Sequence, residues 1–190
     1  MKRLFDILLA ILSMVIFAIP IAIISLAIFL EGGGRVIYKQ ERIGYKGKPF
    51  ILYKFRSMHT NAEMNEEPLL CQDNDSRLTR VGVFLRAHHL DEFPQLWNIL
   101  RGDMSFVGPR PERQFYIDKI IEHDPRYVQL YALRPGIFSL ATLYNGYTDT
   151  MEKMLRRLEM DLDYLEHQSL WLDAKIIWLT ATAILTGKKF

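Results

Sequence analysis

Hydrophobic positions divide the chain into two unlike parts. Residues 7–30 are nearly all apolar, whereas the rest of the chain mixes apolar and polar positions as an ordinary soluble domain does. A helix needs about 20 apolar residues to cross the hydrocarbon core of a bilayer, so this stretch is long enough to do so. The pattern predicts a membrane helix at the start of the chain and a folded body after it.

Two features of the apolar stretch bear on how it enters a membrane. Pro20 lies in its middle, where proline removes a helical hydrogen bond and clashes with the preceding turn. Lys2 and Arg3 precede the stretch, Arg35 and Lys39 follow it, and basic residues favour the cytoplasmic side. A helix that enters, bends near Pro20 and returns to the same face satisfies both features. An ordinary span kinked at Pro20 is equally compatible with the residues alone.

The body carries both strand and helix periods. Residues 36–40 and 50–56 predict two strands joined by a loop that contains Gly44 and Gly47. Helices are expected over residues 94–100, 112–122 and 151–167 and in the segment that precedes residues 134–136. Residues 60–76 are polar and aperiodic and predict a loop. Residues 169–185 hold too short an apolar run to span a bilayer, so we expect them packed on the core or lying at a membrane interface.

The second predicted strand places two cations together. Side chains alternate along a strand, so Lys54 and Arg56 project from the same face as Leu52. A pair of cations on one face suits an anionic ligand. A solvated strand face gives the same pattern, and for a single pair it is the commoner case.

Asp91 and Glu92 are the densest candidate for chemistry. Proline is tolerated in the first turn of a helix, so Pro94 places both carboxylates at a helix N-terminus. The positive end of the helix dipole keeps a carboxylate ionised there and also attracts phosphate. A simple helix cap by Asp91 explains the same residues, and aspartate often has that role.

Arg110 is the second candidate because Pro109 and Pro111 fix the backbone on both sides of it. A guanidinium held in this way suits two-pronged recognition of phosphate, although a turn with an exposed arginine has the same sequence. Farther along, Arg157 and Asp161 are four residues apart on the predicted helix, which is the spacing of a surface ion pair.

Composition narrows the classes of protein. A net charge of +2 is too small to indicate a nucleic-acid-binding surface. The single cysteine, Cys71, can form no intramolecular disulfide, and the five histidines show no zinc-ligand spacing. The sequence has no Walker loop, no G-x-S-x-G and no G-x-G-x-x-G motif, which argues against a nucleotide hydrolase, a serine hydrolase and a Rossmann enzyme.

These motifs together resemble the bacterial sugar transferase family, the small monotopic phosphoglycosyl transferases. The matching segments are residues 2–6, 40–44, 47–50, 53–58, 90–105, 107–111, 134–137 and 172–175. The chain departs from the family pattern at residues 138–142, which read Phe-Ser-Leu-Ala-Thr where the family usually has Thr-Gly-Trp-Ala-Gln, and at His89, where a small hydroxyl residue is common. Both departures bear on the sugar or nucleotide preference.

The resemblance implies an α/β-type, membrane-associated single domain with a small sheet or hairpin, several helices and a re-entrant N-terminal membrane helix. We therefore expect residues 1–34 to be the re-entrant helix and residues 35–190 to be a catalytic domain with interfacial helices on the cytoplasmic face of the bacterial inner membrane. Without a multi-span N-terminal extension, the chain resembles the small members of the family. The lipid bilayer is thus an expected partner, a second copy of the chain is another candidate, and nucleic acid is not expected.

The resemblance also assigns roles to residues. Asp91 would be the nucleophile, with Glu92 assisting metal or proton handling. Lys54, Arg56 and Arg110 would bind the substrate phosphates, and Asp91 with Asp161 would hold Mg²⁺, which a diphosphate substrate usually brings.

The implied reaction moves a sugar-1-phosphate from a UDP-sugar to a polyprenyl phosphate and releases UMP. It passes through a covalent phosphosugar on Asp91, and the polyprenyl phosphate then takes the phosphosugar from it. A first alternative is direct transfer in a ternary complex, with Asp91 as a base or metal ligand. A second alternative is a membrane-anchored scaffold without catalysis, which would not need both the Asp-Glu and the Pro-Arg-Pro motifs.

Overall fold

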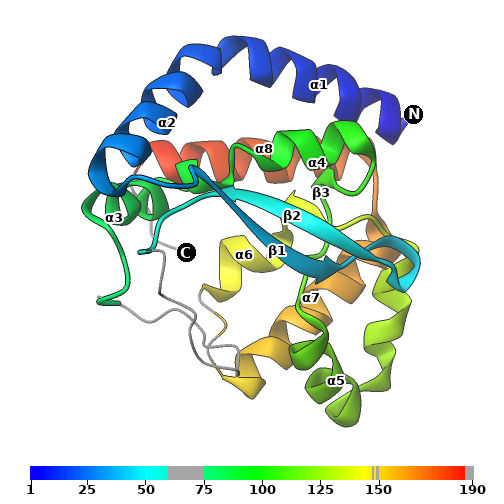
Figure 1. The fold of residues 1–190 in the computed structure, drawn as a ribbon. Coiled ribbons are helices and arrows are strands. Elements are labelled where there is room, and N and C mark those ends of the chain that lie inside the picture. Colours follow the sequence, from blue (N-terminus) through cyan, green and yellow to red (C-terminus); the bar gives the residue numbers. More distant parts are fainter. Residues whose placement is uncertain (60–74, 147, 149, 187–190) are drawn as a thin grey trace.

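The apolar N-terminal stretch forms two helices, α1 (Lys2–Ile16) and α2 (Ala18–Gly32), which meet at a bend of 63° (Figure 1). The computed structural model describes residues 1–59, 75–146, 148 and 150–186. Pro20 cannot donate a hydrogen bond to the carbonyl of Ile16, four residues earlier, and its ring clashes there, so the helix breaks at Phe17. A bend beside Pro20 is therefore present, as the sequence predicted.

The outer surface of this bent pair is apolar. Among the described residues no single helix is long and apolar enough to cross a membrane, whereas α1 and α2 meet that criterion together. The exposed apolar side chains along the pair include Leu4, Leu8, Leu12, Val15, Ile19, Ile23, Leu26 and Leu30. An apolar face of this extent on a bent pair fits a re-entrant helix and equally fits a broken span.

The predicted hairpin is confirmed. Strands β1 (Ile37–Ile43) and β2 (Pro49–Phe55) pair antiparallel, with Tyr38 opposite Lys54, and the 3-10 turn η1 (Tyr45–Gly47) joins them. β1 runs three residues beyond the predicted end, to Ile43, and β2 stops one residue short of Arg56.

Helices and two short strands make up the rest of the body as far as the structure describes it (Figure 1). In chain order these are α3 (Arg80–Ala87), the 3-10 turn η2 (Leu90–Glu92), α4 (Gln95–Arg101), β3 (Ser105–Val107), α5 (Gln114–His123), the 3-10 helix η3 (Pro125–Ala132), β4 (Gly136–Phe138), α6 (Leu140–Asn145), α7 (Met151–His167) and α8 (Leu170–Leu185). The helices predicted at residues 94–100, 112–122 and 151–167 correspond to α4, α5 and α7. The predicted loop at residues 60–76 lies mostly outside the described residues, as does Cys71.

A second, parallel sheet of two short strands brings distant segments together. β3 pairs with β4, with Ser105 opposite Gly136 and Val107 opposite Phe138. A Cβ atom on Gly136 would lie 2.2 Å from the backbone nitrogen of Gly108, and one on Gly108 would lie 2.3 Å from the carbonyl oxygen of Arg134. Gly108 and Gly136 therefore allow the backbones of the two strands to approach closely. The Pro-Arg-Pro segment begins directly after Gly108.

Three apolar clusters hold these elements. The first lies where α1, α4, β3 and α8 meet and contains the fully buried Ile99, Met104 and Ile176. The second joins α5, η3 and α7. The third, called here the α2–β2–α3 cluster, consists of Ile28, Phe55 and Leu85 with their partly buried neighbours. Leu52 of β2 belongs to the first cluster and Phe55 of β2 to the third. The hairpin is therefore packed both on the body and on α2.

For residues 169–185 the packing on the core is confirmed, and the membrane interface stays a prediction. The inner face of α8 is buried at Asp173 and Ile176, so the helix is packed on the core. Its outer face carries Trp171, which is 80% exposed, and Trp178, which is 70% exposed. Tryptophan is enriched where an apolar phase meets water, so this outer face suits a membrane interface.

Candidate active site

Asp91 and Glu92 lie on the turn η2, between α3 and α4. His89 adopts a left-handed backbone (φ 55°) and turns the chain out of α3 into η2. The flanking Leu90 and Phe93 pack against the α2–β2–α3 cluster. Apolar neighbours therefore anchor the turn on both sides of the two carboxylates.

Neither carboxylate is a helix cap. α4 begins at Gln95 after Pro94, and no side chain accepts a hydrogen bond from its first turn. The simple alternative for Asp91, a helix cap, is therefore wrong. The turn instead presents Asp91 and Glu92 to cations from other elements.

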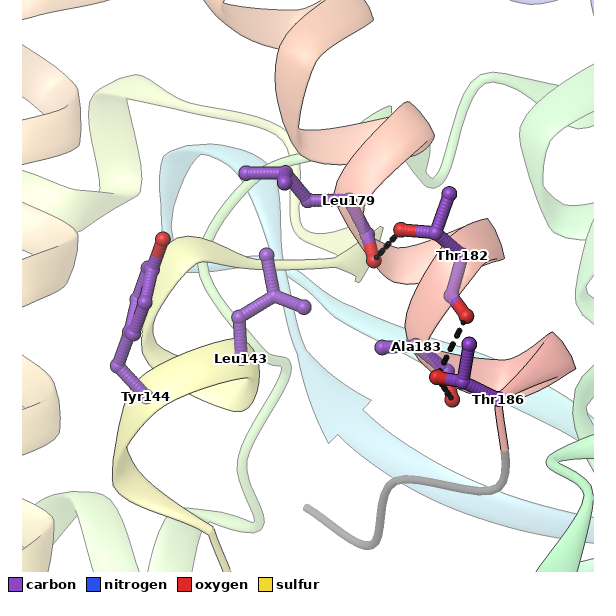
Figure 2. A pocket seen from close by; sticks show the side chains of 6 residues that line it. All are labelled: Leu143, Tyr144, Leu179, Thr182, Ala183 and Thr186. Carbon is purple, nitrogen blue, oxygen red and sulfur yellow. Dashed lines mark hydrogen bonds between the residues drawn. The ribbon is translucent and has the colours of Figure 1, made fainter.

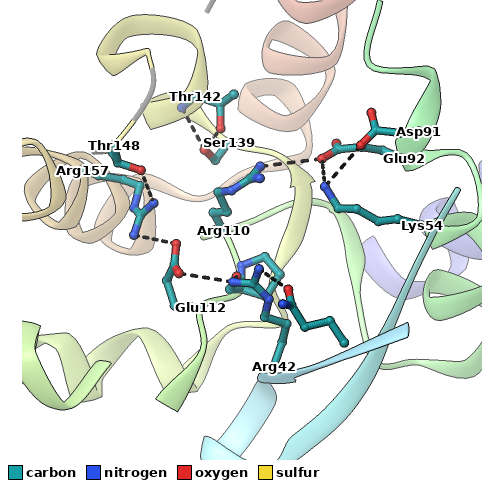
Figure 3. A network of polar contacts seen from close by, with 12 residues as sticks. Arg42, Lys54, Asp91, Glu92, Arg110, Glu112, Ser139, Thr142, Thr148 and Arg157 are labelled. Carbon is teal, nitrogen blue, oxygen red and sulfur yellow. Dashed lines mark hydrogen bonds and ion pairs between the residues drawn. The ribbon is translucent and has the colours of Figure 1, made fainter. Parts of the chain in front are cut away.

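Lys54 of β2 contacts both carboxylates (Figure 3). Its Nζ lies 2.7 Å from Oε1 of Glu92 and 3.8 Å from Oδ2 of Asp91, and all three side chains are less than one-fifth exposed. Lys54 shares its strand face with the buried Leu52, as alternation predicted. An ammonium so placed offsets part of the repulsion between two adjacent buried carboxylates.

The two carboxyl groups differ in proton affinity. Burial raises the pKa of Glu92, but the charges of Lys54 and Arg110 outweigh it and hold that pKa at about 2. Burial also raises the pKa of Asp91, and here Lys54 does not fully compensate, so the pKa stays above its ordinary value. Glu92 is therefore a fixed anion, and Asp91 is the more basic carboxylate of the pair. Adjacent groups with separated pKa values are typical of catalytic sites.

Arg110 projects between two polar clusters (Figure 3). Its Nη1 lies 3.7 Å from Oε1 of Glu92, and its side chain is 40% exposed, so part of the guanidinium remains open to a ligand. The backbone around it is fixed: Gly136 donates to the carbonyl of Pro109 at 3.0 Å, and Arg42 donates to the carbonyl of Pro111 at 3.3 Å. The backbone of Arg110 therefore has little entropy to lose when the side chain binds an anion.

The second polar cluster centres on Glu112, which the sequence did not single out. Arg157 of α7 lies 2.8 Å from one oxygen of Glu112, and Arg42 of β1 lies 3.3 Å from the other. Arg157 also donates to the hydroxyl of Thr148 at 2.8 Å. Burial raises the pKa of Glu112, but Arg157 and Arg42 outweigh it and keep that pKa low.

Arg157 and Asp161 are not a surface pair. Both are almost fully buried, because they lie in the same stripe of α7 as the buried Met154, Leu158 and Leu162. Both residues recur at the helical period of these apolar positions, and this pattern in the sequence could have predicted their burial.

Asp161 is not brought to Asp91. The charges that act on it are those of Arg157, Glu112 and Arg110, and its Oδ1 has no hydrogen-bond partner among the described residues. Burial raises its pKa to about 7, with Arg157 opposing and Glu112 adding to the shift. The expected metal pair of Asp91 and Asp161 is therefore not assembled.

The raised pKa of Asp161 predicts a pH-dependent stability. Its unfolded carboxyl ionises near pH ~4, whereas the native one stays protonated to about pH 7. The native state therefore binds the extra proton in this window, and stability falls as pH rises through it. Asp161→Asn should raise the thermal midpoint by about 5 °C at pH 8 and by about 2 °C at pH 5. Asp163→Asn, an exposed carboxylate on the same helix, should shift it by less than about 1 °C. An equal gain for Asp161→Asn at both pH values would contradict the assignment.

Arg56 lies apart from the carboxylates. Its guanidinium donates to the carbonyl oxygens of Gly33 at 2.6 Å and Ile28 at 3.1 Å, at the C-terminal end of α2. Its backbone nitrogen still donates to the carbonyl oxygen of Val36 at 2.9 Å, so the pairing of the strands continues to Arg56, but the carbonyl oxygens at the end of α2 hold its guanidinium away from the carboxylates. The structure thus brings together Lys54, Asp91, Glu92 and Arg110 and places Arg56 at the helix pair.

The segment that departs from the family pattern, residues 138–142, joins β4 to α6. Ser139 is the N-cap of α6 and accepts a hydrogen bond from the backbone nitrogen of Thr142 at 3.0 Å, and their hydroxyl oxygens are 2.8 Å apart (Figure 3). This segment has a structural reason for its serine, namely a helix cap.

Two hollows in the described part of the chain bear on function. One, of about 230 Å³, lies between α6 and α8 and is mostly apolar; its lining residues are Leu143, Tyr144, Leu179, Thr182, Ala183 and Thr186 (Figure 2). The other is a small hollow of about 10 Å³ at the charged site; its lining residues are Arg42, Leu52, Lys54, Glu92, Gln95, Arg110, Pro111, Gly136 and Ile137. The chemistry-bearing side chains therefore border the second hollow.

A metal ion at this site would need ligands from its substrate. No group of three or more His, Cys, Asp or Glu side chains is placed to hold a metal within the described residues. Mg²⁺ commonly uses one or two carboxylates together with substrate phosphate oxygens. Glu92 is occupied by Lys54 at 2.7 Å, so Asp91 is the carboxylate that fits a Mg²⁺ entering with a diphosphate.

Comparisons with known proteins give one consistent result. The model of a family described as bacterial sugar transferase matches residues 1–187. The UDP-glucose:undecaprenyl-phosphate glucose-1-phosphate transferase of Caulobacter vibrioides is 42% identical over 97% of this chain and 70% of its own length. The UDP-N-acetylgalactosamine-undecaprenyl-phosphate N-acetylgalactosaminephosphotransferase of Aeromonas hydrophila is 39% identical over 98% of this chain, which spans 44% of that protein. The glucose-1-phosphate transferase of Escherichia coli K12 is 41% identical over 95% of this chain and 39% of its own length.

Proposed function

The chain belongs to the bacterial sugar transferase family, and from this premise we propose that it moves a sugar-1-phosphate from a UDP-sugar to a polyprenyl phosphate, releasing UMP. The observation that carries the proposal is the buried pair Asp91 and Glu92, with Lys54 between the carboxylates and the partly exposed Arg110 beside them. Two cations beside a basic carboxylate suit a diphosphate that must be both neutralised and attacked. The names of the relatives from Caulobacter, Aeromonas and Escherichia describe this class of reaction.

The first step is proposed to be covalent. An ionised oxygen of Asp91 attacks the β-phosphorus of the UDP-sugar, and the bond from that phosphorus to the bridging oxygen of the diphosphate breaks. UMP leaves with the bonding electrons, and the phosphosugar remains on the carboxylate as an acyl phosphate. Lys54 and Arg110 offset the charge that develops on the phosphate oxygens. Glu92 orients both cations because each contacts its Oε1.

The second step restores the enzyme. A phosphate oxygen of the polyprenyl phosphate attacks the same phosphorus, and the bond to Asp91 breaks, which returns the carboxylate. The product is a polyprenyl-diphosphate-sugar, and no net proton transfer to the protein is needed. Asp91 and the phosphates of the substrate would hold Mg²⁺ here, and when bound this ion supplies charge neutralisation at the diphosphate.

Turnover by the purified chain tests the proposed function. A UDP-sugar and a polyprenyl phosphate together should give UMP and a lipid-linked diphosphate sugar in equal amounts. A panel of UDP-sugars, offered one at a time, would identify the sugar. A chain that binds both compounds but forms neither product would support the alternative of a non-catalytic scaffold.

The location proposed for this reaction is the cytoplasmic face of a bacterial inner membrane, with α1 and α2 as a re-entrant pair. Basic residues on both flanks of the apolar stretch favour the cytoplasmic side at both ends, and the 63° bend allows the pair to return to that side. The acceptor headgroup lies at the interface because its tail remains in the bilayer. A pair that returns to the same face keeps the site beside that headgroup.

Cysteine labelling should detect the re-entrant topology. With Cys71 replaced, we expect single cysteines placed ahead of Met1 and at the exposed Arg35 both to resist a membrane-impermeant reagent in whole cells. Both should react once the membrane is permeabilised. Pro20→Leu restores a helical hydrogen bond, so part of the population should then span the membrane and expose one end. If the N-terminal cysteine of the protein that keeps Pro20 were labelled in intact cells, the result would contradict the re-entrant topology.

A further inference from the structure

The first turns of α1 direct three polar side chains inward. Asp6 is only 2% exposed, and its carboxylate accepts hydrogen bonds from the hydroxyl of Ser105, at 3.0 and 2.9 Å, and from the backbone nitrogen of Phe106, at 3.1 Å. Lys2 contacts the carbonyl oxygen of Val107 at 3.0 Å and the carboxylate of Asp173 at 2.5 Å. Strand β3, which consists of Ser105, Phe106 and Val107, is therefore bound along its whole length by the membrane helix.

β3 leads directly into the active site. Arg110 follows Val107 by three residues, and the two ends of β3 contact Lys2, through Val107, and Asp6, through Ser105. The third inward side chain, Arg3, donates to the carbonyl oxygens of Ile99 at 2.6 Å and Leu100 at 3.0 Å, near the end of α4. The turn with Asp91 and Glu92 precedes that helix. The start of α1 thus contacts the strand that precedes Arg110 and the helix that follows Asp91 and Glu92.

The rest of the helix pair contacts the turn that carries Asp91 and Glu92 and the strand that carries Lys54. Phe17, at the break, stacks on Phe93 with ring centres 4.9 Å apart, and Phe93 follows Glu92. Arg56 binds the end of α2 and follows Lys54 by two residues. Each segment that carries a site side chain therefore has its own contact with α1 or α2, although none of these contacts takes part in the chemistry.

Of the three inward side chains, Asp6 is the one whose burial is hardest to explain by stability alone. Within the described residues it forms no ion pair, and a buried carboxylate without one is costly unless its hydrogen bonds are fixed. An asparagine at this position has only one acceptor oxygen. Its amide group would meet the Ser105 hydroxyl or the Phe106 backbone nitrogen, which both act as donors here. A carboxylate that accepts from a side chain and a backbone nitrogen of the same strand specifies the position of that strand more tightly than apolar packing does.

We propose that Asp6 is a positioning residue for the transfer reaction: through Ser105 and Phe106 it fixes β3, and so aims Arg110 at the diphosphate beside Asp91. The inference rests on the proposed function, because Arg110 must contact substrate for its position to matter. It makes the membrane helix pair part of the active-site scaffold, not only an anchor. A misplacement of about 1 Å can lower a rate by about a hundredfold, so the effect is measurable.

A double-mutant cycle tests the inference with purified protein, a UDP-sugar and a polyprenyl phosphate. Asp6→Asn should lower kcat/KM by about tenfold to a hundredfold, and Arg110→Lys should lower it by about a hundredfold. If Asp6 acts through Arg110, adding Asp6→Asn to Arg110→Lys should cost less than about threefold more. The shifts in thermal midpoint should be additive. Asp118→Asn, the same change at an exposed carboxylate on α5, should leave the kinetics unchanged.

The contrary result is equally clear. Independent, multiplicative losses from Asp6→Asn and Arg110→Lys would overturn the inference, because a general structural defect acts in that way. Should Asp6→Asn fail to fold, Ser105→Ala removes one of the same hydrogen bonds and completes the cycle with the same criterion. Wild-type protein without turnover would refute the proposed function instead. Hydrogen exchange then decides the inference: Asp6→Asn should speed exchange at residues 105–108 and not in α5, and unchanged protection at residues 105–108 would overturn it.

Discussion

Replacement of Asp91 by asparagine is expected to abolish turnover, by about 10⁴-fold or more, without loss of folding. An amide has no ionised oxygen, so it cannot attack phosphorus. Burial raises the pKa of the Asp91 carboxyl, so removing the acid should not destabilise the turn. Circular dichroism and the thermal midpoint report folding, and UMP release reports activity.

The same variant distinguishes covalent from direct transfer. Wild-type enzyme given a UDP-sugar alone should release UMP in an amount equal to the enzyme, and its mass should rise by one phosphosugar on a peptide that contains Asp91. Asp91→Asn should show neither signal. Glu92→Gln should slow the release while the adduct still forms, because Glu92 orients Lys54 and Arg110. UMP release that strictly requires polyprenyl phosphate, with no adduct on Asp91, would favour direct transfer.

The sequence predicted those elements whose pattern is long and regular. α7 (Met151–His167) has the predicted bounds because its apolar positions recur through four turns. The bend of the N-terminal stretch was also predicted, since proline acts locally on the residue four positions earlier. By contrast, β3 and β4 are three residues each and too short to show a period. Their pairing depends on two glycines whose close approach only the fold reveals.

Within the site, residue type was easier to predict than location. Asp91, Glu92, Lys54 and Arg110 come together as expected, because the turn and the strand that carry them are well defined locally. Arg56 and Asp161 do not join them: the carbonyl oxygens at the end of α2 hold the guanidinium of the first, and the buried face of α7 holds the second.

The cluster around Glu112 was not predicted because its partners come from distant segments. Arg42 precedes Glu112 by 70 residues, and Arg157 follows it far along the chain. No local period relates such positions. The cluster fixes Pro111 and the residues after it, so it shares with β3 the task of holding the Arg110 segment in place.

Lys54→Met should give the second large effect, a loss of turnover of about 10²- to 10³-fold. Lys54 lies between two buried carboxylates, and without it the pKa of Glu92 should rise and the diphosphate should lose a cation. The variant should also unfold more easily, by about 3 kcal/mol, because a buried charge loses its partner. Lys39→Met, on the neighbouring strand and exposed, should change neither quantity by much.

A second substitution separates the two roles of Lys54. In Lys54→Met with Glu92→Gln both members of the buried ion pair are removed, so most of the lost stability should return. Turnover should not return, because the site still lacks the cation that faces the diphosphate. Thermal unfolding and steady-state UMP release, measured on the same preparations, give both quantities. If activity recovered together with stability, Lys54 would be a structural residue that only keeps Glu92 buried, and Arg110 would be left as the cation that faces the substrate.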